Sequence, residues 1–502
     1  MTPALVPLPV VVPLLGAALT LLLTHRPGLQ RSVSVVGLAA TLVVAVVLLV
    51  EAYRHGPVVV QVGGWPAPVG IVLVADQLAA LMLVVSSAVT LCVLLYSIGQ
   101  GRAEIGETAP VSIYHPTYLV LTAGVTNAFL AGDLFNLFVG FEVLLAASFV
   151  LITLGGTETR IRTGSTYVVV SILSSMIFLA AVGLVYAATG TVNMAQLAGR
   201  LDGLPDAVRL TLQLMLLLAF AIKAAVFPVS AWLPDSYPTA PAPVTAVFAG
   251  LLTKVGVYAI IRTETLLFPG GQVSALLMVV AGLTMLVGVL GAVAQSDMKR
   301  LFSFTLVSHI GYMIFGVALS TVAGLSGAIF YVVHHITIQT TLFLVAGLVE
   351  ERAGSTDLRR LGGLARVAPL LAVLFFIPAM NLAGIPPFSG FLGKLGLLQA
   401  GVAAGGVLPG VLVGAGTLTS LLTLYAASRV WNIAFWRAPR LATSSPTVRL
   451  PALMVGATTA LVVFGVALTL AAGPLFRVTT DAAADLRART PYVRAVLPQG
   501  AP

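Results

Sequence analysis

Long runs of apolar residues dominate this chain, and each run is about the length of one membrane-crossing helix. A helix needs about 20 apolar residues to cross the hydrocarbon core of a bilayer, so the sequence predicts about fourteen spans. Their approximate bounds are 4–24, 33–53, 73–98, 113–131, 134–154, 165–189, 208–230, 242–262, 272–294, 301–320, 325–349, 367–400, 407–436 and 450–472. The seventh and twelfth are interrupted by prolines, which predicts broken helices.

The composition supports a polytopic all-α membrane protein. The chain has 502 residues, of which 59% are hydrophobic and 9% charged, and its mean hydropathy is +1.05. Soluble domains carry about 25% charged residues. The net charge of +9 does not indicate nucleic-acid binding, because the arginines stand singly or in pairs in short loops. The single Cys92 excludes an internal disulfide framework and is expected to pack as a small apolar residue.

The loop charges alternate along the chain, and this alternation predicts an orientation. One set of loops holds Arg26, Arg31, Arg102, Arg160, Arg162, Lys299, Arg300, Arg352, Arg359, Arg360, Arg366, Arg437, Arg440 and Arg449. The other set, apart from the C-terminal tail, holds Arg54, Arg200, Arg209 and Arg262. Because lysine and arginine are enriched on the cytoplasmic side, the first set is expected there. With an even number of spans, both termini are then expected outside.

The stretch from Lys223 to Lys254 is the most unusual in the sequence. Two lysines stand in apolar runs on either side of a break with five prolines and Asp235. The twelfth span has a similar break at Pro386 and Pro387, followed by Lys394. Two interrupted segments, five helices apart, are typical of transporters built from inverted repeats.

This spacing divides the chain into five parts. They are three N-terminal helices in 1–112, a first five-helix repeat in 113–262, a second in 272–436, a last transmembrane helix in 450–472 and an extramembrane tail in 473–502. Within the tail, residues 481–497 could form a short surface helix.

A small set of ionisable residues is expected at membrane depth. Its members are Glu142, Lys223, Lys254, His309, His334, His335 and Lys394. Burial lowers the pKa of a lysine and a nearby carboxylate raises it again, so such a lysine can take up and release a proton. Histidine titrates near neutral pH. Together with bound water, these groups would form a proton path, with Glu142 as the expected partner of Lys223.

Each of these residues also has a structural interpretation. The glutamate and the lysines could form ion pairs that fix helix packing, and His309 could be hydrogen-bonded within the bundle. Neighbouring residues on a helix point about 100° apart, so at least one of His334 and His335 is expected to be structural.

The charges near the loops are given lesser roles. Asp235 is expected to cap the next segment or lie at a channel mouth, and Asp133 to cap the fifth span. Asp297, Lys299 and Arg300 are interpreted as a cytoplasmic turn. A solvated loop is predicted to hold Glu350, Glu351, Asp357, Arg359 and Arg360. The sequence has no nucleotide-binding loop and no spacing of metal ligands, so neither a cofactor nor a metal is expected.

Four segments carry a resemblance to a known family. They read FNLFVGFEVLLAASFVLI, KAAVFPVSAWLPDSYPTAPAPVTAVFAGLLTKVGVYAIIR, SDMKRLFSFTLVSHIGYM and NLAGIPPFSGFLGKLGLL. With them the chain resembles the antiporter-like membrane subunits shared by respiratory complex I and the Mrp-type sodium/proton antiporters, over about residues 70–440. YAATGTVNMAQLA and TLYAASRVWNIAFW favour the Mrp branch.

The resemblance implies fourteen helices with two inverted repeats, each with a broken helix. It also implies that the family's charged residues match Glu142, Lys223, Lys254 and Lys394. The family's histidine in the eleventh helix matches His334. Many relatives carry a lysine a few residues later, where this chain has Gln339. The relay in that helix is therefore expected to depend on His334 or His335 and water.

The resulting hypothesis is a proton-translocating subunit of a multi-subunit sodium/proton antiporter in a bacterial cell membrane. It is expected to need the other subunits and to have no enzymatic activity of its own. The alternative is a proton-pumping membrane subunit of a redox complex, such as complex I or a membrane-bound hydrogenase.

Overall fold

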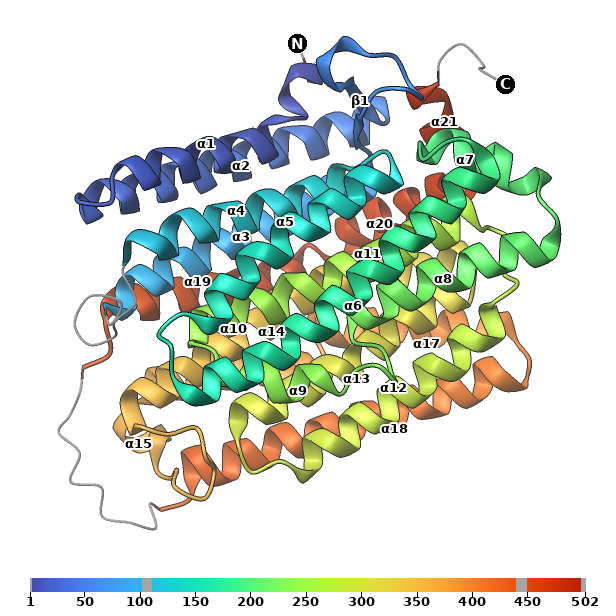
Figure 1. Ribbon diagram of the computed structural model, residues 1–502. Coiled ribbons are helices and arrows are strands. Elements are labelled where there is room, and N and C mark those ends of the chain that lie inside the picture. The colour runs from blue at the N-terminus through green and yellow to red at the C-terminus, as the bar shows by residue number, and fades with distance from the viewer. Residues whose placement is uncertain (1, 102–110, 439–448, 498–502) are drawn as a thin grey trace.

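The protein is a bundle of long helices that run roughly along one direction (Figure 1). We describe a computed structural model in residues 2–101, 111–438 and 449–497. Arg102 and Arg440, which contribute to the predicted orientation, lie outside these residues. The apolar runs form helices because a helix satisfies its backbone hydrogen bonds internally, as a lipid environment requires.

The elements follow one another along the chain in two groups. The first group is η1 (Thr2–Leu5), α1 (Leu8–Leu22), α2 (Pro27–His55), β1 (Val58–Gln61), η2 (Val62–Gly64), β2 (Val72–Ala75), α3 (Gln77–Gln100), α4 (Val111–Leu130), α5 (Leu134–Thr153), α6 (Glu158–Thr189), α7 (Met194–Arg200), η3 (Leu201–Gly203), α8 (Asp206–Ala224), α9 (Trp232–Ser236), η4 (Tyr237–Thr239), α10 (Ala242–Val247), η5 (Phe248–Leu252), α11 (Thr253–Arg262) and η6 (Thr263–Leu267). The second group is α12 (Ser274–Ala294), α13 (Met298–Ala318), α14 (Val322–Ala353), α15 (Leu364–Val367), α16 (Pro369–Ala383), α17 (Ser389–Ala404), α18 (Val407–Val430), η7 (Trp431–Trp436), α19 (Ala452–Leu470), α20 (Ala472–Ala488) and α21 (Thr490–Val496). Of the η segments, η5, η6 and η7 are π-helical.

The prediction of a multi-spanning all-α protein is confirmed. In the described part of the chain, 12 helices are long and apolar enough to cross a membrane, and each lies on a predicted span. The other two predicted spans correspond to α4 and to the pair α16 and α17. The number fourteen is therefore approximate by this measure.

Both predicted helix breaks are present. Helix α8 ends at Ala224. The next residue, Ala225, has a left-handed φ of 57°, and the chain then turns into the short α9. Helix α16 ends at Ala383 and is followed by Gly384, with a φ of 86°, before α17 begins. Glycine suits position 384 for two reasons. It adopts a positive φ without strain, and a Cβ there would lie only 3.0 Å from Cδ of Lys394.

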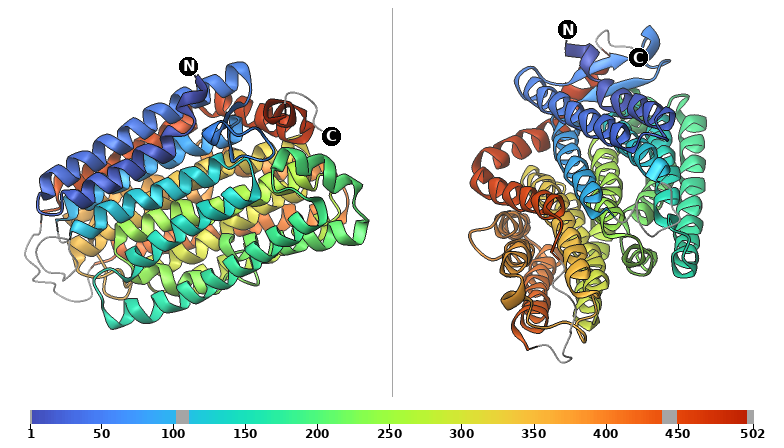
Figure 2. Two further views of the ribbon diagram at one scale, coloured as in Figure 1. Left: turned by 45° about the horizontal axis from the view of Figure 1, so that its top comes forward. Right: turned by 90° about the vertical axis from the view of Figure 1, so that its left-hand side faces the viewer.

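Helix α14 lies at the centre of the bundle. It is 32 residues long and its most apolar window is completely buried. It packs against α3, α10, α13, α16, α17, α19 and α20. Its two histidines are therefore enclosed by protein on every side. Figure 2 shows the bundle from two further sides, with the blue N-terminal helices at its top.

A small antiparallel sheet stands at the end of the bundle that carries the N-terminus (Figure 1). Strands β1 and β2 pair with Val58 opposite Ala75. The first residues of the span predicted at 73–98 therefore belong to strand β2, and helix α3 begins only after Asp76. That side chain caps the helix by accepting a hydrogen bond from the Ala79 amide at 2.9 Å.

The C-terminal helix α20 packs along the first half of α14. Phe476 stacks on Phe330 with ring centroids 4.1 Å apart. The hydroxyl of Ser326 lies 3.0 Å and 2.9 Å from the hydroxyls of Thr479 and Thr480. This part of the tail therefore contributes to the wall around the central helix.

Helices α12 and α13 approach each other closely at Gly288, and this contact can be tested. A Cβ there would lie 2.4 Å from the Ser308 amide nitrogen, so Gly288→Val must push the helices apart. We expect a loss of about 1–3 kcal/mol of stability, measured as a lower thermal unfolding temperature in detergent. Gly183→Val is the control, because nothing lies within 4 Å of that position. Equal unfolding temperatures for the two variants would contradict this packing.

Candidate functional site

The first cluster of buried charge joins three helices. Ser175 of α6 donates a hydrogen bond to Oε1 of Glu142 on α5. Nζ of Lys223, on α8, donates to the same serine hydroxyl at 3.1 Å and lies 4.9 Å from the centroid of the Phe141 ring. The predicted pair of Glu142 and Lys223 is thus connected through a hydroxyl. The sequence analysis did not single out Ser175, because serine is common in helices.

The broken helix places Lys223 at the end of its own half-helix. The lysine is the last residue but one of α8, which ends at Ala224. Free backbone carbonyls and the helix dipole make such an end favourable for a cation. Trp232, after the break, donates from Nε1 to the carbonyl of Ile222 at 3.2 Å and holds the turn closed.

Lys254 stands apart from this cluster. It is completely buried on α11. Its Nζ donates to the carbonyl of Ala249 at 2.6 Å. Ala249 belongs to the π-helical turn η5, and a π turn releases carbonyls from the regular α-helical pattern. Within the described residues, no hydrogen bond links Lys254 to Glu142 or Lys223.

The second cluster is built on α13 and α14. Nδ1 of His309 lies 2.9 Å from the hydroxyl of Tyr331, and its Nε2 lies 3.3 Å from the hydroxyl of Thr423 on α18. The rings of His309 and His335 are 5.3 Å apart between centroids. His309 is therefore hydrogen-bonded on both sides and is also part of a histidine pair.

Lys394 and His334 meet at the second helix break. Nζ of Lys394 donates to the carbonyls of Leu382 and Ala383 at 2.9 Å and 3.0 Å, at the C-terminal end of α16. Nδ1 of His334 lies 3.0 Å from the hydroxyl of Ser389, the first residue of α17. The end of one half-helix thus binds the lysine and the start of the next contacts the histidine.

The adjacent histidines diverge as helix geometry predicts. His334 faces α17, and His335 faces His309 on α13. Nε2 of His334 and both ring nitrogens of His335 are buried without a hydrogen-bond partner among the described residues. Such atoms are costly to bury, so they are places where water or a mobile proton can bind.

Gln339, which stands where many relatives carry a lysine, has a structural contact. Its Nε2 donates to the carbonyl of Phe302 at 2.7 Å, and its Oε1 is buried without a partner among the described residues. The side chain therefore ties α14 to α13 and supplies an acceptor inside the bundle.

An important ion pair escaped the sequence analysis. Nη1 and Nη2 of Arg262 donate to the Asp76 carboxylate at 2.5 Å and 2.8 Å, and Nη2 lies 3.0 Å from the Tyr258 hydroxyl. The guanidinium is almost completely buried and also lies over the ring of Tyr492. Asp76 and Arg262 were missed because both lie at predicted span ends, where charges are ordinary. Burial and the charge of Asp76 raise the pKa of nearby Asp485.

Several predictions for charges near the loops need correction. Glu350 and Glu351 are in the last turns of α14, not in a loop. Lys299 is buried in the first turn of α13 and pairs with Glu350 at 2.6 Å, because α14 extends further than its apolar run. Asp235 is not a helix cap. It forms an exposed ion pair with Arg300 at 2.9 Å.

Other loop predictions are confirmed. Asp133 caps α5 by accepting from the Asn136 amide at 2.6 Å. Asp297 also caps α13, through the Arg300 amide at 2.9 Å, which the sequence did not lead us to expect. Asp357 lies outside the spans and its carboxylate accepts from Arg359, which lowers the pKa of Asp357.

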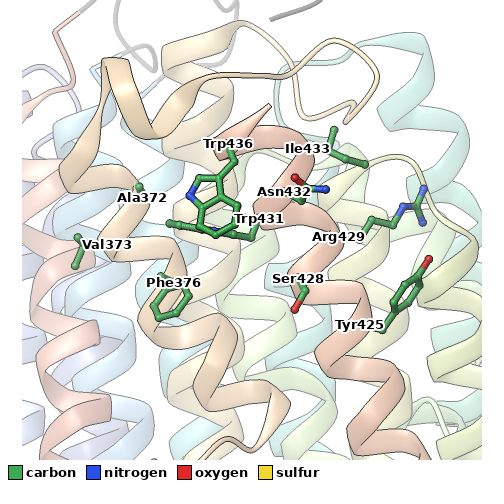
Figure 3. Close-up of a pocket in the computed structure, with 10 residues that line it drawn as sticks. All are labelled: Ala372, Val373, Phe376, Tyr425, Ser428, Arg429, Trp431, Asn432, Ile433 and Trp436. Carbon is green, nitrogen blue, oxygen red and sulfur yellow. The ribbon is translucent and has the colours of Figure 1, made fainter. Parts of the chain in front are cut away.

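In the described ranges no group of three or more His, Cys, Asp and Glu side chains could hold a metal ion. A pocket of about 850 Å³ lies instead between α16 and α18 (Figure 3). Its walls include Phe376, Tyr425 and Trp431, and Arg429 donates to the carbonyl of Val293 at 2.5 Å. None of the seven predicted site residues lines it.

Lysines buried beside interrupted helices, together with histidines buried in the neighbouring continuous helices, are typical of one class, the ion-translocating membrane proteins. The family described as NADH:quinone oxidoreductase/Mrp antiporter, transmembrane, matches residues 131–423. The chain belongs to this family, and it is an integral, multi-pass membrane protein.

Individual relatives cover almost the whole chain. The D-type subunit of the Na(+)/H(+) antiporter of Alkalihalophilus pseudofirmus is 39% identical over 98% of this chain and 99% of its own length. The protein of the same name from Bacillus subtilis is 40% identical over 86% of both. A chain of the Mrp complex from Dietzia sp. superposes with a TM-score of 0.92 at 35% identity, over 98% of this chain and 99% of that chain.

The buried ion pair of Asp76 and Arg262 can be tested by a double-mutant cycle. Arg262→Met leaves a buried carboxylate without its partner and should cost about 3–5 kcal/mol. Asp76→Asn keeps the helix cap but leaves the arginine unpaired. We expect the double variant to lose less stability than the two single losses added together, as measured by thermal unfolding in detergent. Simple additivity would contradict a direct pair.

Proposed function

We propose that this protein is a proton-translocating subunit of a multi-subunit monovalent cation (Na+)/H+ antiporter in a bacterial plasma membrane. The observation that carries the proposal is the hydrogen-bonded link from Glu142 through Ser175 to Lys223 at a helix break. The names of the relatives and the superposition on an Mrp complex chain support it. They also support an assembly with partner subunits.

In this proposal protons pass along the buried groups in sequence. Glu142 sets the proton affinity of Lys223, because a nearby carboxylate favours the charged lysine. Lys254 receives the proton next, followed by the histidines around Tyr331, and Lys394 exchanges with one side. The chain of ring and hydroxyl contacts from His309 to Tyr331 supports the second half of this route.

We further propose the internal organisation and the orientation. The two five-helix repeats, 113–262 and 272–436, each contain one break with its lysine. Both termini lie outside, because the loops at the opposite end hold most of the arginines. The break after Lys223 then lies near the cytoplasmic side, where Asp235 pairs with Arg300.

The alternative is a proton-pumping subunit of a redox complex. A chain of an archaeal membrane-bound sulfane sulfur reductase superposes with a TM-score of 0.90 at 26% identity, and a chain of Thermus thermophilus complex I does so with 0.83 at 27%. The higher identity to antiporter subunits favours the first function. The subunits that co-purify with this chain decide between the two functions. Small membrane subunits would indicate an antiporter complex, and soluble redox subunits would indicate a redox complex.

Lys223→Ala should abolish Na+/H+ antiport by the assembled complex in proteoliposomes. The ammonium is the charged group that contacts the Ser175 hydroxyl from the α8 side, so its loss interrupts the route. The same preparation is checked for a normal complement of subunits. Unchanged antiport in a correctly assembled variant would refute the proposed function.

Removing the bridging hydroxyl should weaken transport without removing either charge. In Ser175→Ala, Lys223 loses an acceptor and Glu142 loses a donor. We expect the antiport rate to fall by about tenfold, since hydrogen bonds to charged groups contribute about 1.5–3 kcal/mol. Ser165→Ala is the control on the same helix, because that hydroxyl is exposed and bonds only to the Ile161 carbonyl among its described contacts. A similar rate in both variants would count against the bridge.

A further inference from the structure

Glu264 is a carboxyl inside a membrane-spanning segment that the route described above does not use. It lies in the π-helical turn η6, within the continuous apolar segment Ala242–Leu267. Its Oε2 accepts a hydrogen bond from Nε2 of Gln213 on α8 at 2.8 Å. Its Oε1 is buried and has no hydrogen-bond partner in the described part of the chain.

An unpartnered buried carboxylate oxygen is costly. A carboxylate accepts hydrogen bonds at both oxygens, and leaving one unsatisfied in a dry site disfavours the charged form. Binding a proton removes the charge, and a water molecule can supply the missing donor. The environment of Oε1 therefore allows the Glu264 carboxyl to gain and lose a proton.

The pair of Glu264 and Gln213 lies at one level of two antiparallel helices. A Cβ on Gly256 of α11 would lie 2.7 Å from the Ala224 amide nitrogen on α8, which fixes the register of the two helices. Ten residues separate Lys254 from Glu264, and ten separate Lys223 from Gln213, a rise of about 15 Å in each helix. The pair thus lies about 15 Å from both lysines, on the side away from the break.

A cavity lies beside this level of the two helices, with Gln213 in its wall, while Glu264 itself does not line it. It has a volume of about 260 Å³ and is lined by Gln213, Arg209, Phe268 and other residues. Exposed Pro269 and Gly270 form its rim. Gln213 therefore contacts Glu264 on one side and the cavity on the other, and the cavity is large enough for several water molecules.

The charged groups around Glu264 are few and mostly paired. Arg262, two residues earlier, is bound by Asp76. Across the cavity, Arg489 pairs with Asp202 at 3.0 Å, and Arg209 pairs with Asp206 at 3.1 Å. The other charged residues on the elements that pack against η6 are Lys254 of α11, Arg200 of α7 and Arg477, Asp481, Asp485 and Arg487 of α20. Among the described contacts, Glu264 has no ion-pair partner of its own.

We propose that Glu264 is the proton-exchange group at the end of the first five-helix repeat that lies away from the break. A hydronium ion that enters from the cavity past Gln213 gives its proton to the Glu264 carboxylate and becomes water. The resulting carboxylic acid then gives the proton to a water molecule on the side of the lysines. Gln213 holds the carboxyl in place. This inference rests on the proposed antiport function.

The test uses the assembled antiporter complex in proteoliposomes, with the pH varied on one side at a time. In Glu264→Gln we expect the Na+/H+ antiport rate to fall at least about tenfold. The remaining rate should no longer depend on the pH of the face that holds the cavity. Glu264→Asp keeps the titratable group and should retain that dependence. Glu51→Gln is the matched control, because Glu51 has its only described side-chain partner in His55 and lies on the distant α2.

Gln213→Leu provides a second test that leaves the carboxyl in place. It removes the donor to Oε2 and the polar link to the cavity, so the rate should fall in the same direction. Wild-type rates and wild-type pH dependence in both Glu264→Gln and Gln213→Leu would overturn the proposal. If Lys223→Ala also retained antiport, the proposed function itself would fail. If antiport were lost in Lys223→Ala but unchanged in Glu264→Gln and Gln213→Leu, only the role of Glu264 would be rejected.

Discussion

The arrangement of the helices depends on the need of each lysine ammonium at membrane depth for hydrogen-bond acceptors. An ammonium there must find acceptors within the protein, and an intact helix offers none because its carbonyls are already bonded. The chain solves this by interrupting helices. Lys394 binds two carbonyls at the end of α16, Lys254 binds a carbonyl of a π turn, and Lys223 lies at the end of α8. Prolines and glycines at the breaks are thus as important as the lysines.

The two breaks share a geometry and differ in their chemistry. Lys394 relies on backbone carbonyls, which cannot change their charge. Lys223 instead donates to the Ser175 hydroxyl, which in turn donates to Glu142, and these side chains can rotate. The first break therefore surrounds its lysine with side chains that can rearrange, and the second surrounds its lysine with backbone groups that are fixed. In the proposed proton path, this asymmetry would give direction to a route that two equivalent repeats would make symmetric.

The sequence was sufficient for much of this picture. Charged residues in apolar runs are rare enough to identify Glu142, Lys223, Lys254 and Lys394 without coordinates, and the prolines revealed the breaks. It failed where a residue is unremarkable by type or position. Ser175 is one serine among many in α6, and its role depends on two helices that meet only in the fold. Asp76, Arg262 and Glu264 stand near predicted span ends, where charge is expected in water. Their burial results from the hairpin and the C-terminal helices that cover this end of the bundle.

Helix α14 explains how the two halves can communicate. It touches the surroundings of lysines in both halves: Thr340 contacts the turn before Lys254, and His334 contacts the start of α17 beside Lys394. Being buried along its length, it cannot shift toward lipid when a charge changes nearby. A change in protonation at one lysine must then be answered by side chains and water around it, in particular by the unpartnered nitrogens of His334 and His335. A rigid central helix with adaptable polar groups favours proton transfer along the bundle over movement of the helices.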